Sequence, residues 1–265
     1  MQWHKFNLFN LKKNDKFPSN PYLPNPLYPD DVFLVSYPKS GNTWVRFLIA
    51  NIIKKNPEDI VDFHSIQKFV PEVIRNNEFI EQLERPRVIK SHGTYTDYPK
   101  VIYLVRDGRD VYVSYYFYRL NKFSEGITFH DFFKRQDHYP CLWGDHVKSW
   151  LFGKNNKPNI LVIKYEDILH DCTEVLKRII NFIGLEVTED EIIGAIEASR
   201  FENMRKLEKE RGRPYKEKEK GPDIFMRQGK QGNWRDFFGI EERKVFKSRE
   251  GELLIRLGYE ENDNW

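Results

Sequence analysis

Several features are scarce in this sequence of 265 residues, and each scarcity excludes a class of protein. Cysteine occurs only at Cys141 and Cys172, which is too few for a disulfide framework or a four-cysteine metal site. No run of 18 apolar residues occurs, so we expect no membrane span. The first residues lack the apolar block of a signal peptide. We therefore expect a cytoplasmic protein with reduced thiols.

Excess charge of one sign is also missing. The chain has 43 Lys and Arg residues against 40 Asp and Glu residues, a net charge of +3. A general nucleic-acid binder would need a stronger overall field, so we expect no nucleic-acid partner. Local basic clusters can still bind a small anion.

Strand and helix patterns alternate along the chain. The run "DDVFLVSYP" predicts a strand over residues 32–35, a turn follows, and "TWVRFLIANIIKK" has helical spacing. Further strands are expected in "PRVIKSH", "KVIYLV" and "NILVIKYEDI", and further helices in "RDGRDVYVSYYFYRL", "TEVLKRIINFIGL" and "GELLIRL". This alternation predicts a single α/β domain over residues 1–265, with a central parallel sheet flanked by helices.

One stretch fits neither pattern. Residues 205–223 are rich in Lys, Arg and Glu and offer little to bury. This composition predicts a charged, lid-like loop.

The turn after the first strand, "SYPKSGNTW", has the properties of an anion-binding loop. A strand-to-helix turn presents free backbone N–H groups and the positive end of the helix dipole, here at residues 40–43. Lys39 adds a point charge, and Gly41 lets the backbone approach closely. Asn42 and Thr43 carry further donors. The alternative is a capped helix that follows a tight turn and binds nothing.

Two more polar groups follow later strands. Lys90 and His92 stand two apart at the end of the second strand and share a face there. Ligands of open α/β sheets lie beyond the carboxyl ends of the strands, so both can face the same cleft as Lys39. Charge stabilisation by a lysine and proton transfer by a histidine would follow. Alternatively, His92 is one of several structural or exposed histidines.

Arg106 follows the third strand directly, and Ser114 comes two helical turns later. An arginine and a hydroxyl suit a phosphate group. The alternative is that the charged residues of "RDGRD" only pair with one another. A second basic loop, "RQGKQGNW" from Arg227, suggests a second phosphate.

Taken together, these segments resemble the sulfotransferases that use 3′-phosphoadenosine 5′-phosphosulfate (PAPS) and release adenosine 3′,5′-bisphosphate (PAP). "YPKSGNTW" is similar to that family's 5′-phosphosulfate loop, "RDGRDVYVS" to its 3′-phosphate motif, and "RQGKQGNW" to its C-terminal RxGxxGxW segment. "IKSH" resembles its Lys-Thr-His segment, and "KYEDI" its Tyr-Glu-Asp segment. The matches run in order from about Asp31 to Asp236.

The resemblance implies a role for each site residue. The 5′-phosphosulfate would lie among Lys39, Ser40, Gly41, Asn42 and Thr43, and the 3′-phosphate among Arg106, Ser114, Arg227, Gln228 and Gly229. The adenine would lie against Trp44, with Tyr165 and Phe201 close to it. Gln228 departs from the family's lysine and can donate only through its amide.

The resemblance also implies a mechanism. His92 would take the proton of an acceptor hydroxyl, Lys39 would stabilise charge on the bridging oxygen, and Lys90 would neutralise the sulfuryl oxygens. No metal is expected, because the loop lacks the second glycine and the Lys-Ser/Thr ending of a magnesium-triphosphate loop.

The sequence leaves the acceptor and the oligomeric state open. Aromatic-rich segments such as "YYFYRL" suit an alcohol, a phenol, or a lipid or glycolipid head group. Two other functions stay possible on the residues alone. One is a P-loop kinase that uses ATP and magnesium, and the other is a nucleotide-binding module without catalysis.

Overall fold

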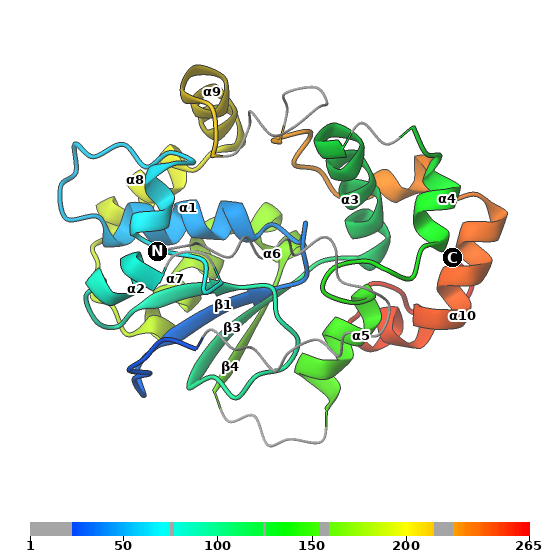
Figure 1. The fold of residues 1–265 in the computed structure, drawn as a ribbon, viewed down its shortest axis with the longest axis horizontal. Coiled ribbons are helices and arrows are strands. Elements are labelled where there is room, and N and C mark those ends of the chain that lie inside the picture. Colours follow the sequence, from blue (N-terminus) through cyan, green and yellow to red (C-terminus); the bar gives the residue numbers. More distant parts are fainter. Residues whose placement is uncertain (1–22, 75–76, 124–125, 154–158, 215–224) are drawn as a thin grey trace, which may run out of the picture.

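The computed structural model describes residues 23–74, 77–123, 126–153, 159–214 and 225–265. Within these residues, parallel strands form a central sheet in the order β2-β1-β3-β4 (Figure 1). The strands are β1 (Val32–Ser36), β2 (Val88–Ser91), β3 (Lys100–Val105) and β4 (Ile160–Lys164). In the register of the sheet, Val35 of β1 lies opposite Ser91 and Tyr103. The predicted α/β fold with a parallel sheet is confirmed.

Helices cover both faces of this sheet (Figure 1). Those on one face are α1 (Asn42–Ile53), α7 (Cys172–Ile183) and α8 (Glu189–Ala198). Those on the other are α3 (Gly108–Phe123), α4 (Phe129–Lys134), α5 (Trp143–Val147) and α10 (Ile240–Arg256). The remaining helices are α2 (Asn77–Gln82), α6 (Tyr165–His170) and α9 (Phe201–Arg211), with short turns of other helix types at Ser65–Lys68, Lys148–Phe152 and Asn233–Asp236.

Strand β1 shows why the central strands are continuously apolar. Its side chains alternate between the two faces, so Val32 and Leu34 join one apolar cluster while Phe33 and Val35 join the other. All four are fully buried. A strand covered by helices on both faces has no solvent face to which polar residues could be assigned.

The structure corrects two predicted element boundaries. Strand β4 ends at Lys164, and the segment "YEDI" already belongs to helix α6. The predicted charged loop begins later than expected, because residues 205–211 continue helix α9. In that helix Met204 and Glu208 are buried one turn apart, so the segment does have a buried face. Residues 215–224 of the predicted loop lie outside the described residues.

No helix in the described part of the chain combines the length and the apolar character that a bilayer crossing requires.

Candidate active site

The residues that follow the four strands line one cavity of about 300 Å³ at the carboxyl edge of the sheet. Lys39 follows β1, His92 follows β2, Arg106 follows β3 and Tyr165 follows β4. Parallel strands bring their carboxyl ends to the same edge, so segments distant in sequence meet there. The predicted site residues that line the cavity are Lys39, Gly41, Asn42, Thr43, Trp44, Lys90, His92, Arg106, Ser114, Tyr165, Phe201, Arg227, Gln228 and Gly229.

The loop between β1 and α1 leaves its amides open to an anion. Gly41 is the N-cap of α1 with φ 97°, and it makes no side-chain capping bond. The first turn of this fully described helix carries no acidic residue. The first amides of a helix have no partner within it, and the dipole places partial positive charge there. Lys39 also has a positive φ of 70°, so the backbone here is held in a conformation that costs free energy.

Two buried donors in this region have no hydrogen-bond partner. They are Ser40 Oγ and the Nε atom of Arg106, two of several such buried atoms in the described residues. A multi-oxygen anion would satisfy both donors. Ser40 does not itself line the cavity, but it lies in the loop that does.

The side chain of Asn42 was expected to donate to a bound anion, but in the structure it bonds to β1. Its Nδ2 atom donates to Ser36 Oγ at 3.1 Å and to the Leu34 carbonyl at 3.5 Å. The amide therefore fastens the loop to β1. What Asn42 offers an anion is its backbone N–H.

His92 is held in one tautomer by the backbone of β1. Its Nδ1 atom lies 2.7 Å from the carbonyl oxygen of Ser36. A carbonyl only accepts, so Nδ1 carries the proton and Nε2 presents a lone pair. Burial, followed by the charge of Lys90, lowers the pKa of His92 to about 3. The imidazole is therefore neutral at neutral pH.

Lys39 lies among aromatic rings and other cations. Its Nζ atom is 4.0 Å from the centroid of the Phe225 ring and 4.7 Å from that of Tyr118. Burial, with the charges of Arg106 and Arg213, lowers its pKa to about 7. An anion bound beside Lys39 would favour the protonated form.

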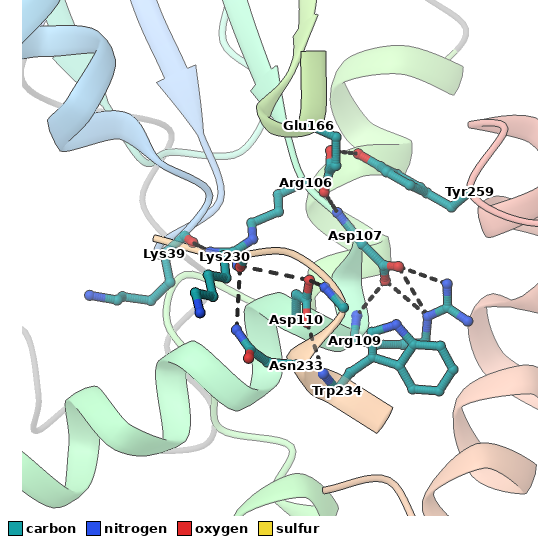
Figure 2. A network of polar contacts seen from close by, with 11 residues as sticks. Lys39, Arg106, Asp107, Arg109, Asp110, Glu166, Lys230, Asn233, Trp234 and Tyr259 are labelled. Carbon is teal, nitrogen blue, oxygen red and sulfur yellow. Dashed lines mark hydrogen bonds and ion pairs between the residues drawn. The ribbon is translucent and has the colours of Figure 1, made fainter. Parts of the chain in front are cut away.

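Arg106 joins the two basic loops (Figure 2). Its guanidinium donates to the Lys39 carbonyl at 3.3 Å and to the Lys230 carbonyl at 2.8 Å. It also stacks on the Tyr165 ring at 4.3 Å. The early loop and the late loop therefore meet around one cation.

Asp110 fixes the late loop from below (Figure 2). Its carboxylate accepts from the N–H of Gly232 at 2.6 Å and from that of Trp234 at 2.9 Å. The alternative of mutual pairing at the helix start holds for Arg109, which bonds Asp107 at 2.7 Å. Arg106 also forms an ion pair within this segment, with Asp110 at 3.9 Å, but its hydrogen bonds go to the carbonyls of Lys39 and Lys230 outside it.

Aromatic rings form one wall of the cavity. Trp44 and Tyr165 meet edge to face with ring centroids 5.9 Å apart. A Cβ atom at Gly41 would lie 2.5 Å from the Tyr165 ring, and one at Gly229 would lie 2.7 Å from the Phe201 ring. Only glycine lets each loop approach its ring this closely.

Sequence reasoning missed several lining residues, of which Glu72 is the most informative. The segment around it runs beside the edge strand, since Lys90 N–H donates to the Pro71 carbonyl at 2.8 Å and Val73 N–H to the Lys90 carbonyl at 2.9 Å. The Glu72 carboxylate accepts from Lys90 Nζ at 3.0 Å. Glu72 is a single glutamate in a segment without helical or strand periodicity, so nothing in the sequence indicated that it belongs to the site. The pairing of Lys90 could not be read from sequence.

In the described part of the chain, no group of three or more His, Cys, Asp or Glu side chains is placed to hold a metal ion.

Comparison with known proteins gives a consistent result. The family model of the sulfotransferase domain matches residues 29–258. Sulfotransferase 1E1 of Cavia porcellus is 30% identical over 241 residues, which cover 82% of this chain and 81% of that protein. A flavonol sulfotransferase-like protein of Flaveria bidentis is 27% identical, and the match covers 97% of this chain and 94% of that protein.

Two solved structures are also similar. Mouse sulfotransferase SULT7A1 complexed with PAP has 27% identity and a TM-score of 0.68, over 89% of each chain. Retinol dehydratase in a complex with retinol and PAP has 25% identity and a TM-score of 0.69, over 86% of this chain and 82% of that one.

Proposed function

This chain belongs to the sulfotransferase family and is a PAPS-dependent enzyme, and we propose that His92 is the general base of its reaction. The reaction is in-line transfer of the sulfuryl group to a hydroxyl of a small-molecule, lipid or glycolipid acceptor. The observation that carries the proposal is the tautomer of His92, whose Nδ1–H bonds the Ser36 carbonyl and leaves Nε2 basic.

The residues that would bind PAPS can be assigned from the hydrogen-bond donors and charges that line the cavity. Amides of residues 40–43, the hydroxyl of Ser40 and the charge of Lys39 suit the 5′-phosphosulfate. Arg106 and the loop that begins at Arg227 suit the 3′-phosphate. The Nε atom of Arg106 is free to donate to it, since this atom has no partner among the described residues. Ser114, Gln228 and Gly229 line the same region. The rings of Trp44, Tyr165 and Phe201 suit the adenine.

Each catalytic residue acts on a different charge. His92 Nε2 takes the acceptor proton while the acceptor oxygen bonds to sulfur and the bond from sulfur to the phosphate oxygen breaks. Lys39 stabilises the charge that develops on that leaving oxygen. Lys90 neutralises the sulfuryl oxygens. Positioning and charge suffice, as in phosphoryl transfer, so no covalent intermediate on the enzyme is needed.

Turnover of PAPS with phenols, alcohols and glycolipids tests the proposal. The parent enzyme should form a sulfated product detectable by mass spectrometry. His92→Ala should lower kcat by ~10²–10⁴-fold, the usual contribution of a general base. Its affinity for PAP should stay within about threefold, because the proposal assigns Nε2 to the acceptor hydroxyl and no contact with the nucleotide to His92. A nucleotide-binding module without catalysis would bind PAP equally well and form no product. Unchanged kcat in His92→Ala would refute the assignment of the base.

A further inference from the structure

The cavity contains a negative charge that the binding of PAPS does not explain. Glu72 is the single acidic residue among the described residues that line the cavity, beside five Lys and Arg residues. A carboxylate near the reacting centre repels an anionic donor, so it weakens donor binding. Because Glu72 lines the same cavity as His92, it can instead contact the acceptor.

We propose that Glu72 selects the acceptor: it favours compounds with a hydrogen-bond donor next to the reacting hydroxyl, as in a vicinal diol, and rejects compounds with a carboxylate there. This inference rests on the proposed function, since it concerns the hydroxyl that His92 deprotonates. It narrows the acceptor class to neutral polyhydroxylated compounds.

The position of Glu72 is fixed by backbone and side-chain bonds together. Glu72 and Lys90 are paired residues of an isolated parallel bridge. Their side chains meet at 3.0 Å and are only 12% and 14% exposed. Charges withdrawn from water to this extent interact more strongly than surface charges do. The ion pair is therefore fixed at one point of the wall, where each charge compensates much of the other's field.

Glu72 lines the same cavity as the base. Lys90 stands two residues before His92, and both line the cavity with Glu72. Burial and Lys90 lower the pKa of His92, and the Glu72 charge raises it by a smaller effect. An acceptor whose hydroxyl faces Nε2 presents its neighbouring substituent to the same wall.

The pair offers complementary hydrogen-bonding groups. An ammonium only donates and a carboxylate only accepts. Of two adjacent hydroxyls, one can donate to Glu72 while the other reacts. A carboxylate in place of the second hydroxyl would set two negative charges side by side away from bulk water. The rings of Tyr115, Tyr118 and Tyr139 line the same cavity and suit a flat or ring-shaped acceptor.

Three compounds of nearly one shape test this preference: phenol, catechol and salicylate. They differ only in the ortho substituent, which is hydrogen, hydroxyl or carboxylate. The quantity to compare is the ratio of kcat/KM for catechol to that for salicylate, in the parent and in Glu72→Gln. The three hydroxyls differ in intrinsic reactivity, but this difference is the same for both enzymes and cancels when the parent ratio is compared with that of Glu72→Gln. The amide keeps an oxygen for Lys90 and removes the charge, so the ratio should fall by about tenfold or more.

A matched control removes the same charge elsewhere. Glu84 pairs with Lys55 at the surface, where its side chain is 73% exposed. Glu84→Gln should leave the ratio unchanged. The ratio of the affinities of the PAP complex for catechol and for salicylate should fall in Glu72→Gln as the ratio of kcat/KM does, which gives a readout independent of turnover.

The outcomes are distinct. If Glu72→Gln changes kcat/KM equally for all three compounds, Glu72 only positions Lys90, and the proposed selection is wrong. A PAP complex that binds none of the three, or binds them without regard to charge, overturns it as well. Failure of the proposed function has another signature, namely no sulfated product from PAPS with any acceptor, although PAP is bound.

Discussion

At the scale of single residues, one backbone bond decides which nitrogen of His92 is basic. Nδ1 donates to the Ser36 carbonyl at 2.7 Å, and Ser36 ends the central strand β1. The strand that precedes the phosphate loop therefore also orients the base. With its pKa lowered to about 3, His92 is neutral at neutral pH, and a PAPS anion bound in the cavity would raise that pKa and so strengthen Nε2 as a base.

Lys39 should take up a proton when nucleotide binds. Burial and nearby Arg residues lower its pKa to about 7, so it is largely neutral at pH 8.5 before binding. Bound phosphate raises that pKa, and the protein must gain close to one proton at pH 8.5 and almost none at pH 6 from this group. Calorimetry of PAP binding at pH 8.5, in buffers of different ionisation enthalpy, measures the uptake.

The control for this prediction is Lys39→Met, which keeps an unbranched side chain without an amine. It should bind PAP more weakly, with no proton uptake at pH 8.5. Equal uptake by the parent and Lys39→Met would assign the proton to another group. The phosphates of PAP contribute little at this pH, because their second pKa lies near 6.

At the scale of elements, two helix-capping glycines allow the cost of backbone strain to be measured apart from the cost of a steric clash. Gly41 and Gly184 are both caps of helices with φ near +95°, at 97° and 93°. A Cβ atom at Gly41 would lie 2.5 Å from the Tyr165 ring, whereas one at Gly184 meets nothing within 4 Å. Replacement by alanine would therefore strain the backbone at both positions, but it would cause a steric clash only at Gly41.

Gly184→Ala should lower the free energy of unfolding by about 1–2 kcal/mol, the cost of a left-handed conformation, and should leave PAP affinity unchanged. Gly41→Ala should show that cost and also weaken PAP binding by about tenfold or more, because Tyr165 must move. Denaturant unfolding and PAP titration measure both quantities. Equal PAP affinity in the two variants would contradict the described contact.

The elements also show what sequence could predict. The strand, loop and helix of residues 32–53 follow from a continuous apolar run, a glycine and helical spacing, all of them local signals. Helix α9 was missed because charged residues dominate it, although Glu208 is buried where it accepts from the N–H groups of Phe225 and Met226. Glu72 was missed because its role depends on which segment lies beside β2. Neither contact leaves a mark in local sequence.

At the scale of the whole molecule, a polar network connects the site to the C-terminal segment (Figure 2). Glu166, which follows β4, accepts from the Asp107 N–H at 3.1 Å and from the Tyr259 hydroxyl at 3.1 Å. Asp110 and Arg106 continue the network to the late basic loop. Strand ends, helix α3 and the C-terminal segment are therefore fixed relative to one another.

Asp110→Asn tests this connection. An amide has one accepting oxygen where the carboxylate has two, so it cannot accept from both Gly232 and Trp234 in the same way. We expect a loss of about 1–3 kcal/mol in the free energy of unfolding and weaker PAP binding. The control is Asp137→Asn, whose exposed side chain pairs with Arg135. If Asp110→Asn behaved like this control in both measurements, the late loop would not depend on Asp110.

The most direct test of the account is a calorimetric titration with PAP, beside ATP with magnesium. The account predicts tight, stoichiometric binding of PAP and at least a tenfold loss in Arg106→Ala, because a charge-assisted contact to the 3′-phosphate disappears. A preference for ATP with magnesium, with Arg106→Ala unaffected, would contradict it.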